Sequence, residues 1–388
     1  MEIKKIVGEV CKTARSLWEE VFYEDSVQFT DYYFENKAEK NIGYVIGEAP
    51  YDAMMFRTPY TLQIGDARKE ISYIVGVATR KECRHRGLMR SLLMHSFQKM
   101  YEEKQPFTFL MPANPAIYEP FDFRYIYERD VWKIKEGVDV EAYLETEVEY
   151  VTSDGQELRA AGFEDSGNYR SYTLGNGLYR VSKLQEQFPY IPILDMLAEF
   201  ANGYLKERYN IYVHRDKSYY EMQLKESQAQ NGDIYVLVSD GEIKAFFLYA
   251  KEEDEVFIQE VIEAEEGILD FLKKTDEKKP IIMARIIHLE EMLKLVCSKE
   301  DKEVVLQVKD ELIPENTGVY RWKMTPKGSQ VVKIQSKNDA EKELKAAWMD
   351  EESEIFAEEK TETAEVISVH IHDLAVYVLR DIFLNEIV

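Results

Sequence analysis

A group of basic side chains stands in the run Arg84-His85-Arg86-Gly87-Leu88-Met89-Arg90, between a strand-like segment at 71–79 and a helical pattern. The first N–H groups of a helix lack partners within it, and the helix dipole makes that end electropositive. Gly87 permits close approach of the backbone to a ligand, and the arginines can donate charge-assisted hydrogen bonds. The run therefore predicts an anion site that suits a pyrophosphate. A solvated basic helix turn is the alternative, and the run is neither a Rossmann fingerprint nor a P-loop.

The elements that would position this run follow from the spacing of apolar residues. Apolar side chains recur at helical spacing over 14–22 and again from Met89 to about Glu103. Strand-like runs at 42–49, 54–65 and 71–79 are separated by turn residues and predict an antiparallel meander, and a further strand is expected at 107–111. Helix, meander, helix and strand together predict a compact α+β unit.

A second unit is expected to begin near Asp130. It contains a predicted helix at 192–208, two strands joined at Asp240-Gly241, and a strand that leads into a helix within 255–272. This order repeats that of the first unit. At its strand-to-helix junction, however, acidic residues replace the basic ones: Glu263, Glu265 and Glu266. We therefore interpret the second unit as a duplicate of the first that has lost phosphate binding.

The third unit is expected to begin near Pro280, with a helix from Met283 to Val296 and strands at 304–310, 318–325 and 330–336. An acidic stretch runs from Asp339 to Glu359, and an amphipathic segment at 373–388 ends the sequence. Terminal segments are usually polar and frayed. An apolar ending therefore predicts a segment that docks against the rest of the protein.

The composition limits the partners and the compartment. Lys and Arg number 49 against 73 Asp and Glu, a net charge of −24 that repels nucleic acid and anionic membrane surfaces. A cationic partner fits better, and simple solubility of an acidic surface is the alternative. Three scattered cysteines favour neither a disulfide framework nor a thiolate metal site. Without a signal-like start or a run of roughly 18 apolar residues, we expect a cytoplasmic protein with no membrane partner.

The runs VATRKECRHRGLMRSLL and FTFLMPANPAIYEPFDF resemble the GNAT acetyltransferases. That family's motif is Arg or Gln, two residues, Gly, one residue, then Gly or Ala; Arg84, Gly87 and Met89 take these positions, and Met89 departs from the small residue. The runs are similar to the enhanced intracellular survival protein branch of this superfamily. The resemblance covers the whole chain and implies an α+β fold class with three domains: a catalytic GNAT domain at 1–129, a degenerate GNAT-like domain at 130–280 and a sterol carrier protein-like domain at 281–388.

The resemblance also implies acetyl-CoA as co-substrate and no metal. The backbone of Val77, Ala78 and Thr79 would pair with the pantetheine amides as an added strand does, and an N–H near Val77 or Ala78 would hold the developing oxyanion. The residues implied to bind the pyrophosphate are Arg84, His85, Arg86, Gly87, Leu88, Met89 and Arg90.

Tyr118 matches the family's tyrosine that donates a proton to the departing coenzyme A thiolate. A phenol with an ordinary pKa of about 10 is protonated at pH 7 and can do so. Plain core packing of Tyr118 is the alternative. Nearby, Asp122 stands where the family usually has glycine; Asp tolerates left-handed backbone better than most residues, so the same turn is expected.

The general base is implied to be the α-carboxylate of Val388, because in the resembled branch the C-terminus enters the N-terminal active site. The apolar ending LNEIV suits a fixed, partly buried terminus, and burial would raise the pKa of that carboxyl above about 3.3 to 3.7. A terminus buried for stability alone is the alternative. Direct transfer to the amine, without an acyl-enzyme, follows.

Three further candidates carry less weight. His370 and His372 are two apart on an expected strand, as metal ligands can be, but no further ligand is near in sequence. Cys83 adjoins the arginines and is either an activated thiolate or a buried cysteine. Glu24 and Asp25 either line an amine pocket or form a solvated helix end.

The sequence thus favours an N-acetyltransferase that acts on a primary amine of a cationic acceptor such as an aminoglycoside, a polyamine or a lysine. The resemblance further suggests a homo-oligomer, often hexameric. Two alternatives remain open: a non-catalytic protein that binds acyl-CoA or lipid, and a transferase for a longer acyl group.

Overall fold

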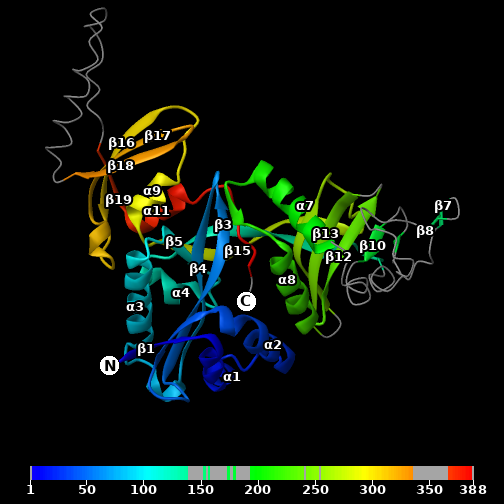
Figure 1. Ribbon diagram of the computed structural model, residues 1–388, viewed down its shortest axis with the longest axis horizontal. Helices are drawn as coiled ribbons and strands as arrows, with labels where there is room; N and C mark the ends of the chain where they lie inside the picture. The colour runs from blue at the N-terminus through cyan, green and yellow to red at the C-terminus, as the bar shows by residue number, and fades with distance from the viewer. Residues whose placement is uncertain are drawn as a thin grey trace, which may run out of the picture.

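The structure, a computed structural model, describes residues 2–138, 193–239, 242–252, 255–334 and 366–386. It also describes four short strands, at 152–153, 156–157, 173–174 and 178–180. Sheets of nine, five and four strands, each covered by helices, dominate the described part of the chain (Figure 1). The predicted α+β class is confirmed.

The nine-stranded sheet forms the body of the first unit. Its path is β1-β2-β3-β4-β5-β15-β6; β11 pairs with β3, and β20 pairs with β11. The expected meander is present, since β2, β3 and β4 are antiparallel neighbours. The strands are β1 (Ile3–Val7), β2 (Ile42–Ile46), β3 (Ala53–Ile64), β4 (Ala67–Thr79), β5 (Phe107–Leu110), β6 (Arg124–Ile134), β11 (Ile211–Val213), β15 (Leu272–Ile286) and β20 (Ile382–Phe383).

Successive residues of these strands face different cores, as the two-residue period of a strand requires. Phe56 of β3 packs with Trp18 on the face covered by α1 (Arg15–Val21) and α2 (Val27–Tyr32). Its neighbour Met55 packs with Phe97 on the face covered by α3 (Leu88–Glu102). Both predicted helices of the first unit are confirmed. Shorter helical segments are η1 (Gly8–Ala14), η2 (Tyr33–Lys37), η3 (Ala38–Lys40), η4 (Lys81–Cys83), α4 (Pro115–Tyr118) and η5 (Glu119–Phe121).

The second unit packs two helices on a five-stranded sheet of order β14-β13-β12-β10-β9. The predicted helix at 192–208 is present as α7 (Ile193–Arg208), and Leu197 and Tyr220 pack on Phe246 of the sheet. The predicted pair of strands is also present, whereas its turn at Asp240-Gly241 lies outside the described residues. The remaining elements are α8 (Lys217–Ala229), β7 (Thr152–Ser153), β8 (Gln156–Glu157), β9 (Thr173–Leu174), β10 (Leu178–Arg180), β12 (Asp233–Ser239), β13 (Glu242–Glu252) and β14 (Glu255–Glu263).

The helix expected after this hairpin is wrong. After β14 the chain turns through Gly267, which has φ +88°, and enters β15 directly. The Glu263 carboxylate accepts the N–H of Leu269 at 2.7 Å and fixes this turn. Leu269 and Phe271 then bury against Tyr235 and Phe247, so tertiary packing overrides the local helical pattern.

The third unit is a four-stranded sheet of order β18-β17-β16-β19 that packs on α9 (Leu289–Lys294) and α11 (Ile371–Val378). Three of its strands confirm the prediction. The helix expected from Met283 to Val296 is wrong in its first half, because Met283 to Ile286 pair with β5 and the helix begins only at Leu289. The acidic stretch Asp339–Glu359 lies outside the described residues. The strands and the short helix are β16 (Lys302–Lys309), η6 (Pro314–Asn316), β17 (Gly318–Thr325), β18 (Gly328–Ile334) and β19 (Val366–His370).

Two segments from beyond the first unit complete its sheet. β15 pairs with both β5 and β6, and β20, close to the C-terminus, pairs with β11, which itself pairs with β3. After α11 the chain passes between the first sheet and α8 (Figure 1). The expected boundaries at 129/130 and 280/281 fall inside β6 and β15, so the division into three domains stays a prediction.

Candidate functional site

The first sheet opens between β4 and β5. These parallel strands pair only at Tyr73 and Phe109, so among the described strands none pairs with the β5 side of β4 beyond Tyr73. On the opposite side the register with β3 shifts: Met54 faces Ala78 and Phe56 faces Val75. Gly76 and Val77 therefore lie opposite a single residue and form a β-bulge. The predicted binding strand, Val77 to Thr79, is the edge of this opening.

Gly76 is required by its surroundings. Its φ is +60°, and a Cβ added there would lie 2.6 Å from the indole of Trp18. Trp18 is held in place by Asp25, which accepts the Nε1–H at 2.8 Å, and by stacking on Tyr33. Burial raises the pKa of Asp25. Asp25 therefore supports the wall behind the bulge rather than an open amine pocket, and Glu24 is exposed.

The predicted anion loop follows β4 directly. His85 (φ +61°) and Gly87 (φ +76°) both have left-handed backbone, and Gly87 is the N-cap of α3. Such turns direct successive N–H groups toward one point, which favours an anion. Two of the arginine side chains donate to carbonyls just before the loop, Arg84 Nε to Thr79 O at 3.2 Å and Arg86 Nη2 to Glu82 O at 2.9 Å.

The charges of this loop are available to a ligand. Arg84, Arg86 and Arg90 are exposed, and none of them forms an ion pair with another described residue. Arg90 lies over the Phe121 ring, 5.6 Å from its centroid. The geometry and the donor set fit a pyrophosphate.

Cys83 is not an activated thiolate. It is buried, and burial is the largest cause that raises the pKa of its thiol. The nearby Asp52 carboxylate raises this pKa further, and Arg86 lowers it by a smaller amount. The buried-cysteine alternative holds.

Tyr118 ends α4, directly beyond the end of β5. Asn114 caps this short helix by accepting the N–H of Ala116 at 3.0 Å. Tyr118 is buried, and burial raises its pKa to about 12, so the phenol is a stable proton donor at neutral pH. It packs in one cluster with Val77, Leu88 and Met89. The structure thus brings the predicted strand, loop and tyrosine together.

The turn after Tyr118 has the expected backbone. Asp122 adopts left-handed backbone, with φ +63°. Its carboxylate also contacts His372, whose Nδ1 lies 3.1 Å from Oδ1. The expected strand position of His372 is wrong, since it lies in α11 and only His370 ends the strand. No group of three or more possible metal ligands occurs among the described residues.

The C-terminal tail carries a residue that the sequence did not single out. Glu386 is 1% exposed, and one of its oxygens accepts the hydroxyl of Tyr219 at 3.1 Å. Burial raises its pKa to about 7, and Glu260 adds to this effect while Arg215 opposes it. The sequence signal was an acidic residue inside the apolar ending LNEIV. Val388 lies outside the described residues.

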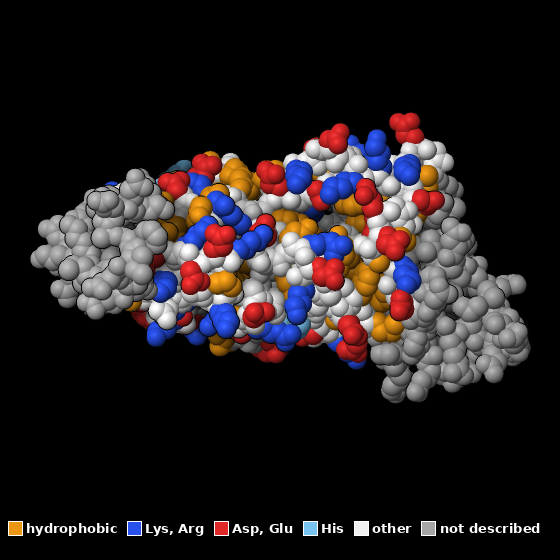
Figure 2. Space-filling model, turned by 90° about the horizontal axis from the view of Figure 1, so that it is seen from above, with side chains coloured by type: hydrophobic (Ala, Val, Ile, Leu, Met, Phe, Trp, Pro, Cys, Tyr) orange, Lys and Arg blue, Asp and Glu red, His pale blue; other side chains and the backbone are white. Residues whose placement is uncertain are grey.

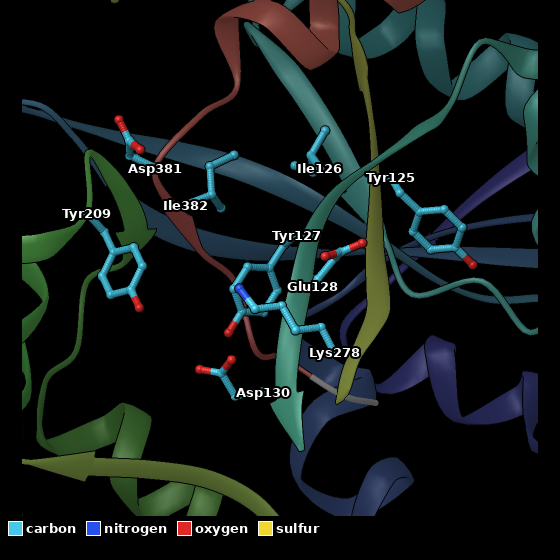
Figure 3. A pocket seen from close by; sticks show the side chains of 9 residues that line it. All are labelled: Tyr125, Ile126, Tyr127, Glu128, Asp130, Tyr209, Lys278, Asp381 and Ile382. Carbon is cyan, nitrogen blue, oxygen red and sulfur yellow. The ribbon is translucent and has the colours of Figure 1, made fainter. Parts of the chain in front are cut away.

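A cavity of about 420 Å³ lies beside this tail, where β6 and β15 meet the turn after α7 (Figure 3). None of its lining residues belongs to β4, β5 or the anion loop, so it is separate from the predicted site. Tyrosine rings and carboxylates form most of its wall: Tyr125, Ile126, Tyr127, Glu128, Asp130, Tyr209, Lys278, Asp381 and Ile382.

Comparison with known proteins identifies the first unit. Residues 2–126 match the family described as acetyltransferase (GNAT) domain. This part of the chain is a GNAT acetyltransferase domain, and the protein is an N-acetyltransferase; enzymes of this class use acetyl-CoA. No curated protein sequence matches the chain. In the described residues no helix is long and apolar enough to cross a bilayer.

Solved structures share the fold over most of the chain. A probable N-acyltransferase from Enterococcus faecalis V583 has a TM-score of 0.62 at 16% identity, with 86% of this chain and 85% of that chain covered. A GCN5-related N-acetyltransferase from Anabaena variabilis has a TM-score of 0.59 at 14% identity, with 86% of each covered. Eis1 from Mycobacterium abscessus has a TM-score of 0.59 at 11% identity, with 98% and 90% covered.

Proposed function

We propose that this enzyme transfers the acetyl group of acetyl-CoA directly to a primary amine of a cationic acceptor. One observation carries the proposal. The bulged edge of β4 opens away from β5 and is followed directly by the exposed arginine loop, and Tyr118 packs in one cluster with Val77 of that edge and Leu88 of that loop. A strand edge, an anion loop and a proton donor are the groups that an acyl-CoA donor requires.

In this proposal the arginine loop, Arg84 to Arg90, binds the pyrophosphate. The backbone of Val77, Ala78 and Thr79 pairs with the pantetheine arm, since no described strand pairs with that side of β4. The bulge at Gly76 and Val77 turns an N–H toward the thioester carbonyl, where negative charge develops during attack.

Tyr118 acts as general acid in this proposal. The thiolate that leaves takes its proton, and the acyl group moves to the nitrogen without a covalent enzyme intermediate. Burial raises the pKa of Tyr118 to about 12, so the phenol carries its proton at neutral pH and is available as a donor to the departing thiolate.

The α-carboxylate of Val388 acts as general base. The tail supports this because it returns to the first sheet and buries Glu386 only two residues before the end of the sequence. Burial raises the pKa of Tyr73, and the charge of Glu386 raises it further. The hydroxyl of Tyr73 accepts the N–H of Met111, just beyond the end of β5, at 3.3 Å.

The acceptor is proposed to be an aminoglycoside, a polyamine or a lysine side chain. The net charge of −24 favours attraction of cations over anions. On the face shown in Figure 2, acidic and basic side chains are interspersed, so the excess of acid is not gathered into one patch there. The support for a cationic acceptor therefore comes from the net charge and not from an acidic patch on that face.

We further propose that the second unit is a degenerate GNAT-like domain and the third a sterol carrier protein-like domain, in a cytoplasmic homo-oligomer. The antiparallel β12-β13-β14 sheet under α7 and α8 supports the first assignment. The small sheet under α9 and α11 is compatible with the second. Light scattering coupled to gel filtration measures the oligomeric state, and a monomer contradicts that part.

The direct test of the function is release of free coenzyme A thiol over a panel of amines. Acetylation of cationic polyamines, aminoglycosides or lysine peptides is expected, with little turnover of neutral amines of similar size. Binding of acetyl-CoA without turnover of any amine contradicts the proposal.

A further inference from the structure

The turn that follows Tyr118 is held by two residues that lie far away in the sequence. His372 Nδ1, in α11, lies 3.1 Å from Asp122 Oδ1. A carboxylate can only accept, so this nitrogen donates. Arg285 Nη2, in β15, lies 3.7 Å from the other oxygen of Asp122. One carboxylate of the first unit thus forms a hydrogen bond with the third unit and a longer ion pair with β15.

The arginine in this arrangement is firmly anchored. Arg285 and Asp310 are both fully buried and pair at 2.8 Å. Asp310 in turn accepts the N–H groups of Leu312 and Ile313 at 3.0 and 2.9 Å. The guanidinium also lies 5.0 Å from the ring centroid of Phe97, in the helix that begins at the anion loop. A buried pair of this kind is costly to disrupt, so it forms a fixed reference for Asp122.

The path from Asp122 to Tyr118 is short. Asp122 donates its N–H to the carbonyl of Glu119 at 3.0 Å, which closes the turn. The next residue, Phe123, donates its N–H to the Tyr118 carbonyl at 3.4 Å. Its ring also packs against that of Tyr118, with centroids 5.9 Å apart. A shift of Asp122 therefore moves Phe123 and the tyrosine it contacts.

The presence of aspartate at position 122 agrees with a structural contribution of its carboxylate to this turn. Left-handed backbone is free of strain only for glycine, so an aspartate there carries a conformational cost. The contacts of its carboxylate with His372 and Arg285 are what the aspartate adds.

We propose that His372 is a positioning residue for Tyr118: together with Arg285 it holds Asp122 and the turn that orients the phenol. The third unit is thereby part of the catalytic arrangement. This inference rests on the proposed role of Tyr118 as general acid.

The test compares variants of the full chain in the thiol-release assay. His372→Leu is expected to lower kcat by roughly tenfold to a hundredfold, as small misplacements of catalytic groups do, with the KM for acetyl-CoA within about twofold of wild type. His372→Asn places an amide N–H near the position of Nδ1 and is expected to restore most of the activity. His370→Leu is the matched control, since that ring stacks on His372 but makes no hydrogen bond to Asp122.

Double variants separate positioning from general destabilisation. When His372→Leu is added to Tyr118→Phe, no loss of kcat beyond that of Tyr118→Phe is expected. When it is added to Asp122→Gly, no loss beyond that of Asp122→Gly is expected. A further loss of the same size in the Tyr118→Phe background overturns the proposal. Wild-type kcat in His372→Leu beside an impaired Tyr118→Phe overturns the positioning role and leaves the acid role standing. Wild-type kcat in Tyr118→Phe itself contradicts the acid role, and with it this inference.

Discussion

The hydroxyl of Tyr219 donates to Oε1 of Glu386 at 3.1 Å and joins α8 of the second unit to the C-terminal tail. The other oxygen of Glu386 has no hydrogen-bond partner among the described residues. Arg215, the cation that acts on Glu386, is already paired through both guanidinium ends with Glu260. A carboxyl in this setting holds its proton tightly, which is why its pKa is raised to about 7.

Glu386 should make stability depend on pH. Because its pKa is higher in the folded chain, about 7, than its ordinary 4.5, its stabilising contribution is complete below pH 4.5 and is lost as the pH rises through 7. The loss amounts to about 3 kcal/mol. Glu386→Gln should remove it, so that urea unfolding at pH 4.5 and 7.5 shows a smaller decrease in the variant. Parallel decreases in both proteins would contradict the assigned burial of Glu386.

Gly76 should be intolerant of a side chain. Gly76→Ala places a Cβ 2.6 Å from Trp18 on a backbone with φ +60°. The left-handed backbone costs about 1 to 2 kcal/mol and the overlap about 1 to 3 kcal/mol more. We expect a loss of about 2 to 5 kcal/mol in thermal or urea unfolding, with a higher KM for acetyl-CoA because the bulge shifts.

Gly87→Ala is the matched control for stability. Gly87 has φ +76°, but an added Cβ would meet nothing within 4 Å. Only the backbone cost of about 1 to 2 kcal/mol is expected. Equal losses in the two variants would show that Trp18 does not press on the bulge.

Much of the first unit follows from local sequence pattern. The strands at 42–46 and 53–79 and the helix after Gly87 were predicted because their apolar residues alternate or recur within a few positions. β15 was missed because its identity depends on partners more than 130 residues upstream, in β5 and β6. The same residues in isolation carry a helical pattern from Met283 onward, and sheet pairing prevails over it.

The candidate site likewise has residues that the local sequence predicts and contacts that it does not. The arginine loop and Tyr118 were predicted because motif and chemistry lie together in one stretch of sequence. The bond between Asp122 and His372 joins residues 250 positions apart, and that between Tyr219 and Glu386 joins residues 167 apart. Neither contact leaves a local signal in the sequence, so only the three-dimensional arrangement reveals them.

The arginine loop should govern affinity for the donor. In an Arg84→Ala, Arg86→Ala double variant, loss of two charge-assisted contacts should raise the Kd for coenzyme A by roughly 10- to 100-fold in calorimetry, with a weaker dependence on salt. The melting temperature should stay near that of wild type, because both side chains are exposed.

Arg68→Ala is the control for net charge, since Arg68 is exposed at the opposite end of β4, where its Nε donates to Gln63 Oε1 at 3.2 Å. Its Kd should equal that of wild type. An unchanged Kd in the double variant would remove the pyrophosphate assignment.

In the proposed mechanism, a site built in the first unit depends on the end of the chain. The most direct measurement is kcat for thiol release, at saturating acetyl-CoA and amine, in a variant that lacks Ile387 and Val388, beside Val388→Ala, which keeps the terminal carboxylate in place. Loss of a general base should lower kcat by roughly 100-fold or more in the shortened chain, whereas Val388→Ala should retain most of it. Full activity of the shortened chain would contradict the account.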